Sequence, residues 1–160
     1  MDNPIEQTPD LETPRARLPE EAAADLPLVG TEKMRILLVD DEPEIRELFA
    51  ALLRRRGWEV VCAASAMEGL EALEENQFNL ILMDIQMPEI SGLDATRVIR
   101  RREQAGESPY TPIVAVTAWT LPEFRQACQA AGMDDFLAKP VTLSHLWSTV
   151  ERNAKPAENQ

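Results

Sequence analysis

The sequence predicts an α/β protein with a doubly wound parallel sheet of five strands, flanked by five helices. Apolar runs and amphipathic runs alternate five times within about 120 residues, as in a parallel sheet with helical crossovers. The apolar runs are continuous rather than alternating with polar residues, as expected of strands buried on both faces. Four of them end in polar groups, at the sheet edge where α/β proteins bind ligands.

The predicted strands and helices follow one another from residue 35 to residue 150. Continuous apolar runs predict the strands, and apolar residues spaced three or four apart predict the helices. In the first helix, Pro43 suits the first turn and Gly57 suits the position after the last turn. Strands are expected at 35–39, 58–62, 80–84, 113–117 and 135–138, with helical stripes at 45–53, 66–73, 91–102, 121–131 and 143–150.

The charge of the chain argues against nucleic acid and membrane surfaces as partners. The 160 residues carry a formal net charge of −12, whereas a phosphate-binding surface needs clustered Lys and Arg, and anionic lipids would repel such a chain. The third helix does end in three arginines, Arg100 to Arg102. Because cations suit the end of a helix dipole, we interpret them as a solvated helix end.

The sequence contains neither a membrane-spanning run nor a signal peptide that we can identify. A bilayer-spanning helix needs about 20 apolar residues, and no run of that length occurs. Cys62 and Cys128 stand far apart without a CxxC pair. We therefore interpret both cysteines as small buried hydrophobic residues in a reducing compartment, which predicts a cytoplasmic location.

The two ends of the chain differ in composition from its middle. Residues 1–33 contain five prolines and eight acidic residues against three basic ones, so we expect a disordered Pro-rich acidic tether. The alternative is a docking segment around Leu26-Pro27-Leu28-Val29. The folded domain is expected at 34–153, and 154–160 is expected to be a disordered tail.

The polar groups at the strand ends predict a cation site for phosphoryl chemistry. Two unit charges about 4 Å apart repel by about 4 kcal/mol at an effective dielectric constant of about 20, so Asp40, Asp41 and Asp84 need a cation if they converge. Lys139 can neutralise one carboxylate, and Mg²⁺ suits the other oxygen ligands. Mg²⁺ with Lys139 and the Thr117 hydroxyl would suit a transferring phosphoryl group, with Asp84 as the nucleophile.

Four motifs in this order resemble the receiver domain of two-component response regulators. The resemblance covers about 34–153 and implies a flavodoxin-like sheet with strand order 2-1-3-4-5 between five helices. It also implies an output surface formed by the fourth helix, the fifth strand and the fifth helix. The matching residues are Val39-Asp40-Asp41-Glu42, Met83-Asp84-Ile85-Gln86-Met87-Pro88 with Gly92, Val116-Thr117-Ala118 and Phe136-Leu137-Ala138-Lys139-Pro140.

The resemblance assigns a role to each site residue. It implies that Asp84 takes a phosphoryl group from a phosphohistidine on a histidine kinase or histidine phosphotransfer protein. It also implies that Lys139 precedes a cis peptide bond and that Thr117 and Phe136 form the switch. Such a domain catalyses only its own phosphorylation and dephosphorylation, and we expect a monomer. The implied ligands of Mg²⁺ are Asp41 directly, Asp40 largely through water, Asp84, and the backbone carbonyl of Gln86.

Other interpretations of these residues remain open at this stage. Phe136 could be only a core aromatic residue, and a solvated or capping role is expected for His145. Trp119 and Gln86 could control the access of water to the phosphoryl group, or Trp119 could be an ordinary exposed side chain.

Three readings of the whole protein also remain open. As a receiver, the chain could stand alone or be part of a hybrid sensor kinase. A receiver-like scaffold that is never phosphorylated is the main alternative. An aspartyl-phosphate hydrolase is disfavoured because Ile85 and Gln86 follow Asp84, where that family has a second Asp two residues on.

Overall fold

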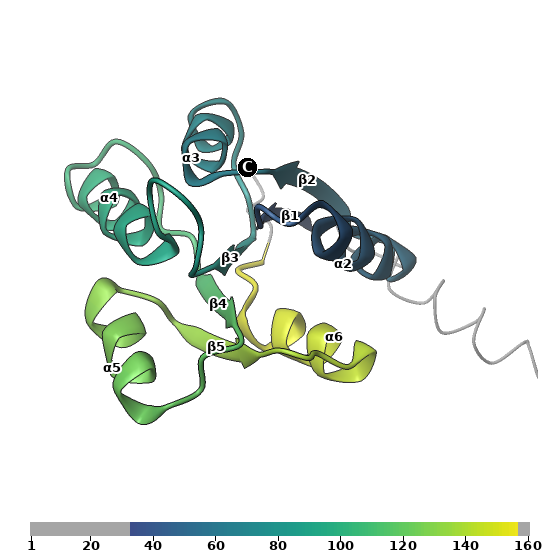
Figure 1. The fold of residues 1–160 in the computed structure, drawn as a ribbon. Helices are drawn as coiled ribbons and strands as arrows, with labels where there is room; N and C mark the ends of the chain where they lie inside the picture. The colour runs from purple at the N-terminus through teal and green to yellow at the C-terminus, as the bar shows by residue number, and fades with distance from the viewer. Residues whose placement is uncertain (1–32, 157–160) are drawn as a thin grey trace, which may run out of the picture.

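The computed structural model describes residues 33–156 and contains one sheet of five parallel strands (Figure 1). The strand order β2-β1-β3-β4-β5 confirms the predicted fold class. The predicted tether, apart from Lys33, and residues 157–160 lie outside the described residues. The elements are β1 (Arg35–Val39), α2 (Pro43–Arg55), β2 (Glu59–Ala63), α3 (Ala66–Glu75), β3 (Leu80–Asp84), α4 (Gly92–Gln104), β4 (Ile113–Thr117), α5 (Pro122–Ala131), β5 (Asp135–Ala138) and α6 (Leu143–Asn153).

Helices cover both faces of the sheet and divide the core into two layers (Figure 1). One layer packs α3, α4 and α5 against the sheet, and the other packs α2 and α6 against it. β3 and β4 are buried at every position, which explains why their sequences are continuous apolar runs. Within the described residues, no helix combines the length and the apolar character needed to cross a membrane.

Capping residues at the N-termini of three helices explain where these helices begin. Ser65 caps α3 by accepting a hydrogen bond from the Glu68 amide, and the Glu68 carboxylate accepts one from the Ala64 amide. The pair is a variant of the capping box in which Glu68 reaches the residue before the N-cap. Ser91 caps α4 by accepting from the Asp94 amide, and Thr142 caps α6 by accepting from the His145 amide.

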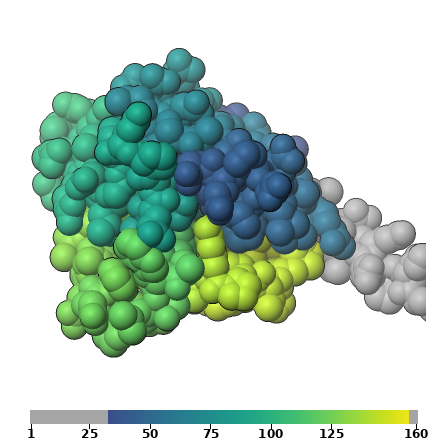
Figure 2. Space-filling model, viewed as in Figure 1, coloured from purple at the N-terminus to yellow at the C-terminus, as the bar shows by residue number. Residues whose placement is uncertain are grey.

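The first and last described helices lie side by side, as Figure 2 shows for the blue and yellow surfaces. The Trp147 indole donates a hydrogen bond of 3.0 Å to the Leu52 carbonyl. Arg56, at the end of α2, pairs with Glu151 of α6 and also lies 5.1 Å from the centre of the Trp147 ring. These contacts fasten α6 to the sheet face that α2 covers.

The prediction that both cysteines are buried is wrong for Cys62. Cys128 is buried in α5, whereas Cys62 is exposed in β2. The reason is the strand order, because β2 forms an edge of the sheet and has only β1 as a neighbour. A short apolar run does not reveal whether a strand is central or at an edge.

The prediction of a solvated helix end is wrong for Arg100. Its side chain is only 13% exposed and donates hydrogen bonds to the Gly132 and Thr111 carbonyls at 2.9 Å. It also pairs with Glu103 at 2.7 Å and with Asp134 at 2.8 Å. Arg100 therefore joins the end of α4 to the segments that precede β4 and β5.

The folded unit also extends beyond Asn153, where the disordered tail was predicted to follow. The Lys155 amide donates to the Asn79 carbonyl at 2.9 Å, and the Asn79 side-chain amide donates to the Lys155 carbonyl at 2.7 Å. The Lys155 ammonium reaches the Tyr110 carbonyl at 2.7 Å. Ala154 and Lys155 thus run across the starts of the central strands, where Lys155 forms hydrogen bonds with Asn79 and Tyr110.

Candidate functional site

The sheet topology brings the predicted site residues to one edge. Asp84 is the last residue of β3 and pairs in register with Val116, next to Thr117. Val39 pairs with Met83, so the Asp40-Asp41 pair follows β1 beside Asp84. The Lys139 amide donates to the Thr117 carbonyl at 2.9 Å, which places Lys139 just beyond β5.

Three carboxylates converge at this edge. One oxygen from each of Asp40, Asp41 and Asp84 lies within 4.8 Å of the others. Asp40 and Asp84 are buried, at 2% and 6% exposure, whereas Asp41 is partly exposed. The Lys139 ammonium lies 3.5 Å from Asp40 Oδ2 and 3.8 Å from Asp84 Oδ1. One cation thus faces three acidic side chains.

Burial, together with the neighbouring carboxylates, changes the acidity of Asp84. Burial raises the pKa of Asp84 to about 7, and the charges of Asp40 and Asp41 add to this effect. The Lys139 charge and the hydrogen bond from the Gln86 backbone lower it only in part. An additional cation would relieve this repulsion.

The donor set at this edge fits Mg²⁺. Carboxylate oxygens from the ends of adjacent strands are the ligands that Mg²⁺ prefers, and this ion needs only a few protein ligands because it keeps several waters. Asp40, Asp41 and Asp84 offer one oxygen each within the same small volume. Gln86 is exposed two residues beyond Asp84, on the loop that borders the carboxylates.

Helix α4 approaches the backbone of Asp84 so closely that only glycine fits at its first position. A Cβ atom at Gly92 would lie 2.1 Å from the Asp84 carbonyl oxygen. The Gly92 amide donates to the Ile85 carbonyl at 2.9 Å, and its own carbonyl accepts from the buried Thr96 hydroxyl at 2.8 Å. In the sequence Gly92 is only part of a motif, and this close approach gives its physical role.

Arg46, which is not among the predicted site residues, also supports the site. Its guanidinium donates a hydrogen bond of 2.7 Å to the Asp40 carbonyl, while the Asp40 carboxylate accepts from the Glu42 amide at 2.9 Å. Together these bonds fix the turn that carries Asp40 and Asp41. The available signal was a basic residue in the first turn of α2, where the dipole favours acids.

Trp119 borders a shallow groove beside the acidic cluster. Ile85, Gln86 and Met87 also line the groove, together with residues at the start of α4. The Trp119 amide donates to the Thr117 hydroxyl oxygen at 3.0 Å, and its ring packs on Phe124 with centroids 4.6 Å apart. Trp119 is therefore held beside the buried Thr117, as the sequence position suggested.

The remaining predicted residues lie away from the carboxylates or behind them. Phe136 is half-buried against the core layer of α3, α4 and α5, and the Arg125 guanidinium lies 4.7 Å from its ring centre. The peptide bond between Lys139 and Pro140 is cis, as the resemblance implied. His145 is exposed in the first turn of α6, and its amide takes part in the Thr142 cap.

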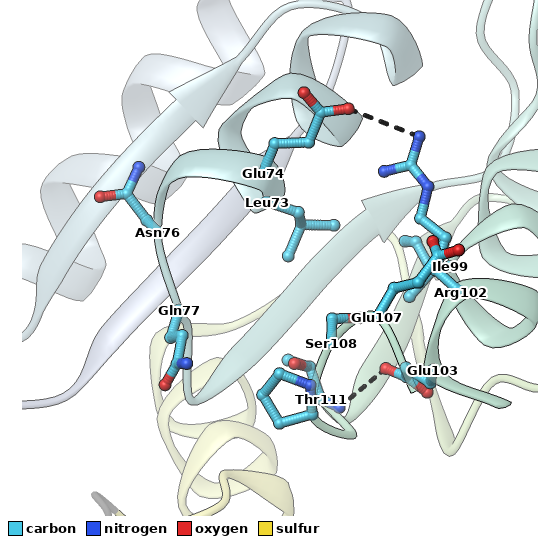
Figure 3. Close-up of a pocket in the computed structure, with 11 residues that line it drawn as sticks. Leu73, Glu74, Asn76, Gln77, Ile99, Arg102, Glu103, Glu107, Ser108 and Thr111 are labelled. Carbon is cyan, nitrogen blue, oxygen red and sulfur yellow. Dashed lines mark hydrogen bonds and ion pairs between the residues drawn. The ribbon is translucent and has the colours of Figure 1, made fainter. Parts of the chain in front are cut away.

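A separate pocket opens at the opposite end of the sheet, between α3 and α4 (Figure 3). Its lining includes Asn76 and Gln77, which precede β3, and Pro109 and Thr111, which precede β4. The acidic cluster instead follows the strands. This pocket is therefore not part of the candidate site.

Comparison with known proteins identifies the domain type. The family model "Response regulator receiver domain" matches residues 36–151. The chain is 43% identical over 106 residues to the CAI-1 autoinducer sensor kinase/phosphatase CqsS of Vibrio cholerae, covering 66% of this chain and 15% of that protein. It is 35% identical over 133 residues to the sensor protein GacS of Pseudomonas syringae, covering 82% of this chain and 15% of that protein. The chain thus spans a small part of these relatives.

Solved structures with the same fold include a chemotaxis protein and two receiver domains, each from a different organism. The chemotaxis protein CheY4 of Vibrio cholerae has a TM-score of 0.70 and 31% identity, covering 76% of this chain and 99% of that one. The receiver domain of the sensor histidine kinase PA1611 of Pseudomonas aeruginosa, described with a magnesium ion coordinated in the active site cleft, has a TM-score of 0.68 and 35% identity, covering 76% and 98%. The Saccharomyces cerevisiae Ssk1 receiver, crystallised with the histidine phosphotransfer protein Ypd1, has a TM-score of 0.71 and 27% identity, covering 78% and 90%.

Proposed function

This chain belongs to the response regulator receiver domain family and is a receiver of two-component phosphorelay signalling, and we propose that Asp84 carries its phosphoryl group. The observation that supports this assignment is the convergence of Asp40, Asp41 and Asp84 beside Lys139. Asp84 lies at the end of the central strand β3 and pairs in register with Val116 of β4, while Asp40 follows the β1 residue that pairs with Met83.

In the proposed reaction, an Asp84 carboxylate oxygen attacks the phosphorus of a phosphohistidine on a partner protein. The new O–P bond forms as the P–N bond breaks, and the electron pair stays on the imidazole nitrogen, which takes up a proton. Lys139 would then pair with one phosphoryl oxygen and the Thr117 hydroxyl would donate to another. Lys139 is already 3.8 Å from Asp84, so only a small movement is needed.

Asp40, Asp41, Asp84 and the backbone carbonyl of Gln86 would hold Mg²⁺ in this site. The chemistry that Mg²⁺ supplies there is positive charge against the oxygens of the transferring phosphoryl group. Two observations support this cofactor. Burial, with the charges of Asp40 and Asp41 adding to it, raises the pKa of Asp84 to about 7, and the PA1611 receiver is described with a magnesium ion in its active site cleft.

We propose that phosphorylation shifts the domain between two arrangements. Thr117 would move toward the phosphoryl group, and Phe136 would turn inward behind it. Phe136 of β5 pairs in register with Ala115 of β4. The two switch residues, Phe136 on β5 and Thr117 on β4, therefore lie on adjacent strands. The surface of α5, β5 and α6 would then change for partner proteins.

The family of the domain and the net charge of the chain together support a proposal for its partner proteins. A histidine kinase or a histidine phosphotransfer protein would donate the phosphoryl group, as in the signalling relatives. The net charge of −12 supports a chain that binds neither nucleic acid nor membranes. We also propose that the chain is a cytoplasmic monomer and that residues 1–33 form an acidic tether. Its catalysis would be limited to the domain's own phosphorylation and dephosphorylation.

Intact-mass measurement after incubation with Mg²⁺ and acetyl phosphate tests this function. A gain of one phosphoryl group in the native chain, absent in Asp84→Asn, is the expected result. No gain in the native chain would favour the scaffold interpretation. Continuous release of phosphate from stable esters would favour an aspartyl-phosphate hydrolase.

A further inference from the structure

The pocket between α3 and α4 has a volume of about 340 Å³ and an apolar floor (Figure 3). Leu73 of α3 and Ile99 of α4 form this floor, and Ile99 is only 3% exposed. Asn76 stands on one wall and Arg102 on the opposite side. An apolar segment with a negative charge at one end would match this arrangement.

The described part of the chain begins beside the Asn76 wall. Arg35, at the start of β1, donates from its guanidinium to the Asn76 side-chain carbonyl at 3.2 Å, and its backbone amide donates to the Asn79 side chain at 2.8 Å. Lys33 stands two residues earlier, and between them Met34 packs against the core layer of α2 and α6. Residues that precede Lys33 therefore join the fold at the same end of the sheet as this pocket.

The chain carries a matching segment at the right distance from Lys33. Leu26-Pro27-Leu28-Val29 is the apolar run of the N-terminal region, where Ile5, Leu11 and Leu18 stand singly among polar and small residues. Three residues separate Val29 from Lys33, and an extended chain spans about 3.3 Å per residue. Val29 can therefore lie up to about 13 Å from Lys33, at the end of the sheet where the pocket opens.

The cation of the pocket, Arg102, favours one direction of this segment, although Glu74, Glu103 and Glu107 also line the pocket. Asp25 directly precedes Leu26, and Arg102 lies across the pocket from Asn76 (Figure 3). The ion pair of Arg102 with Glu74 is 3.6 Å long, with 33% and 61% of the two side chains exposed. Such a loose surface pair leaves Arg102 able to bind a second carboxylate.

We propose that residues 25–29 dock into the α3–α4 pocket of the same chain. Leu26 and Leu28 contact Leu73 and Ile99, and Asp25 pairs with Arg102. A short tether gives an effective concentration of the order of millimolar, so even a weak site is occupied. Docking holds the N-terminal region against α3 and α4, at the end of the sheet away from Asp84.

The proposal predicts which variants change the pocket in solution. In the full chain, the pair Leu26→Asp and Leu28→Asp should shift the backbone amide resonances of Leu73, Asn76 and Ile99 in ¹⁵N-edited NMR spectra. The matched pair Leu11→Asp and Leu18→Asp should leave them unchanged. All four positions precede the folded unit, so circular dichroism should be the same for both pairs.

A charge reversal supplies the second test. Asp25→Arg should shift the same resonances, and adding Arg102→Asp should restore them in part. Equal effects of the two leucine pairs, or none from either, would overturn the proposal. Shifts that disappear on dilution of the native chain would also overturn it, because they would assign the pocket to a second copy.

Discussion

The Lys139 ammonium nitrogen lies 3.8 Å from the Asp84 carboxylate, at the ends of strands that are separated in the sheet by β4. The same ammonium lies 3.5 Å from Asp40. With Asp41 close by, one lysine faces three acids, and the cluster keeps a net negative charge when all are ionised. This imbalance underlies the expected affinity for a divalent cation.

Replacing Lys139 with Gln should reduce the structural response to phosphorylation more than it reduces the rate of phosphorylation. The variant keeps the nucleophile but loses the charge that would pair with a phosphoryl oxygen. We expect Asp84 to accept phosphate at a reduced rate, with little change in the resonances of β5 and α6 on phosphorylation. Lys155→Gln is the control, because Lys155 contacts Tyr110 rather than the acids. A normal structural response in the Lys139 variant would contradict its assigned role.

Stability should depend on pH through Asp84 when Mg²⁺ is absent. Its pKa is about 7 in the folded chain against an ordinary value of 3.8, so its contribution to stability is complete below about pH 4 and is lost as pH rises through 7. Asp84→Asn should therefore gain stability relative to the native chain between pH 5 and 8, by roughly 1–3 kcal/mol. Urea denaturation at several pH values measures this.

Mg²⁺ should reverse the difference in stability between the native chain and Asp84→Asn. Because it binds the ionised cluster, it should stabilise the native chain at pH 8 and have little effect on Asp84→Asn. Asp94→Asn is a matched control, since Asp94 is exposed and pairs with Arg97 at 2.7 Å. Equal stabilisation of all three proteins by Mg²⁺ would show that the ion does not bind at Asp84.

Gly92→Ala should disturb the site through the backbone. The added Cβ would lie 2.1 Å from the Asp84 carbonyl oxygen, so the helix or the strand end must move. We expect a loss of roughly 2 kcal/mol or more in urea denaturation, with slower phosphorylation. In Gly69→Ala the new atom meets the Val39 side chain at 3.0 Å, and the gain in helix propensity of about 1 kcal/mol should offset most of the cost. Similar losses in both variants would contradict this explanation.

The strand ends could be predicted from the sequence because apolar runs stop abruptly at Asp40, Asp84, Thr117 and Lys139. Parallel topology then places these residues at one edge, whatever the details of packing. The motif resemblance added the strand order, which periodicity alone does not determine.

Contacts between distant segments could not be predicted in this way. The burial of Arg100 depends on Gly132, Thr111 and Asp134, which local periodicity does not relate to α4. The exposure of Cys62 depends on β2 lying at an edge. Gly92 is a turn residue in the sequence, and only the packing of α4 on Asp84 shows why a side chain is excluded there.

Trp119→Ala should increase the rate at which the acyl phosphate is lost. Trp119 borders the groove with Gln86 and Met87, so removing the indole opens a path for water to the phosphoryl group. We expect a severalfold faster loss of phosphate from Trp119→Ala, measured by mass spectrometry after removal of the phosphodonor. The rate of loss should also change in Gln86→Ala. Trp58→Phe is the control, because Trp58 is buried in the other core layer. Unchanged rates at both groove positions would remove this hypothesis.

The most direct test of the account is to locate the phosphate within the chain. Borohydride reduces an aspartyl phosphate to homoserine, so a chain phosphorylated with Mg²⁺ and then reduced can be digested and sequenced by mass spectrometry. We expect homoserine at position 84, and only when Mg²⁺ and the phosphodonor were both present. Homoserine at Asp40 or Asp41 instead, or none at any position in a chain that gained phosphate, would contradict it.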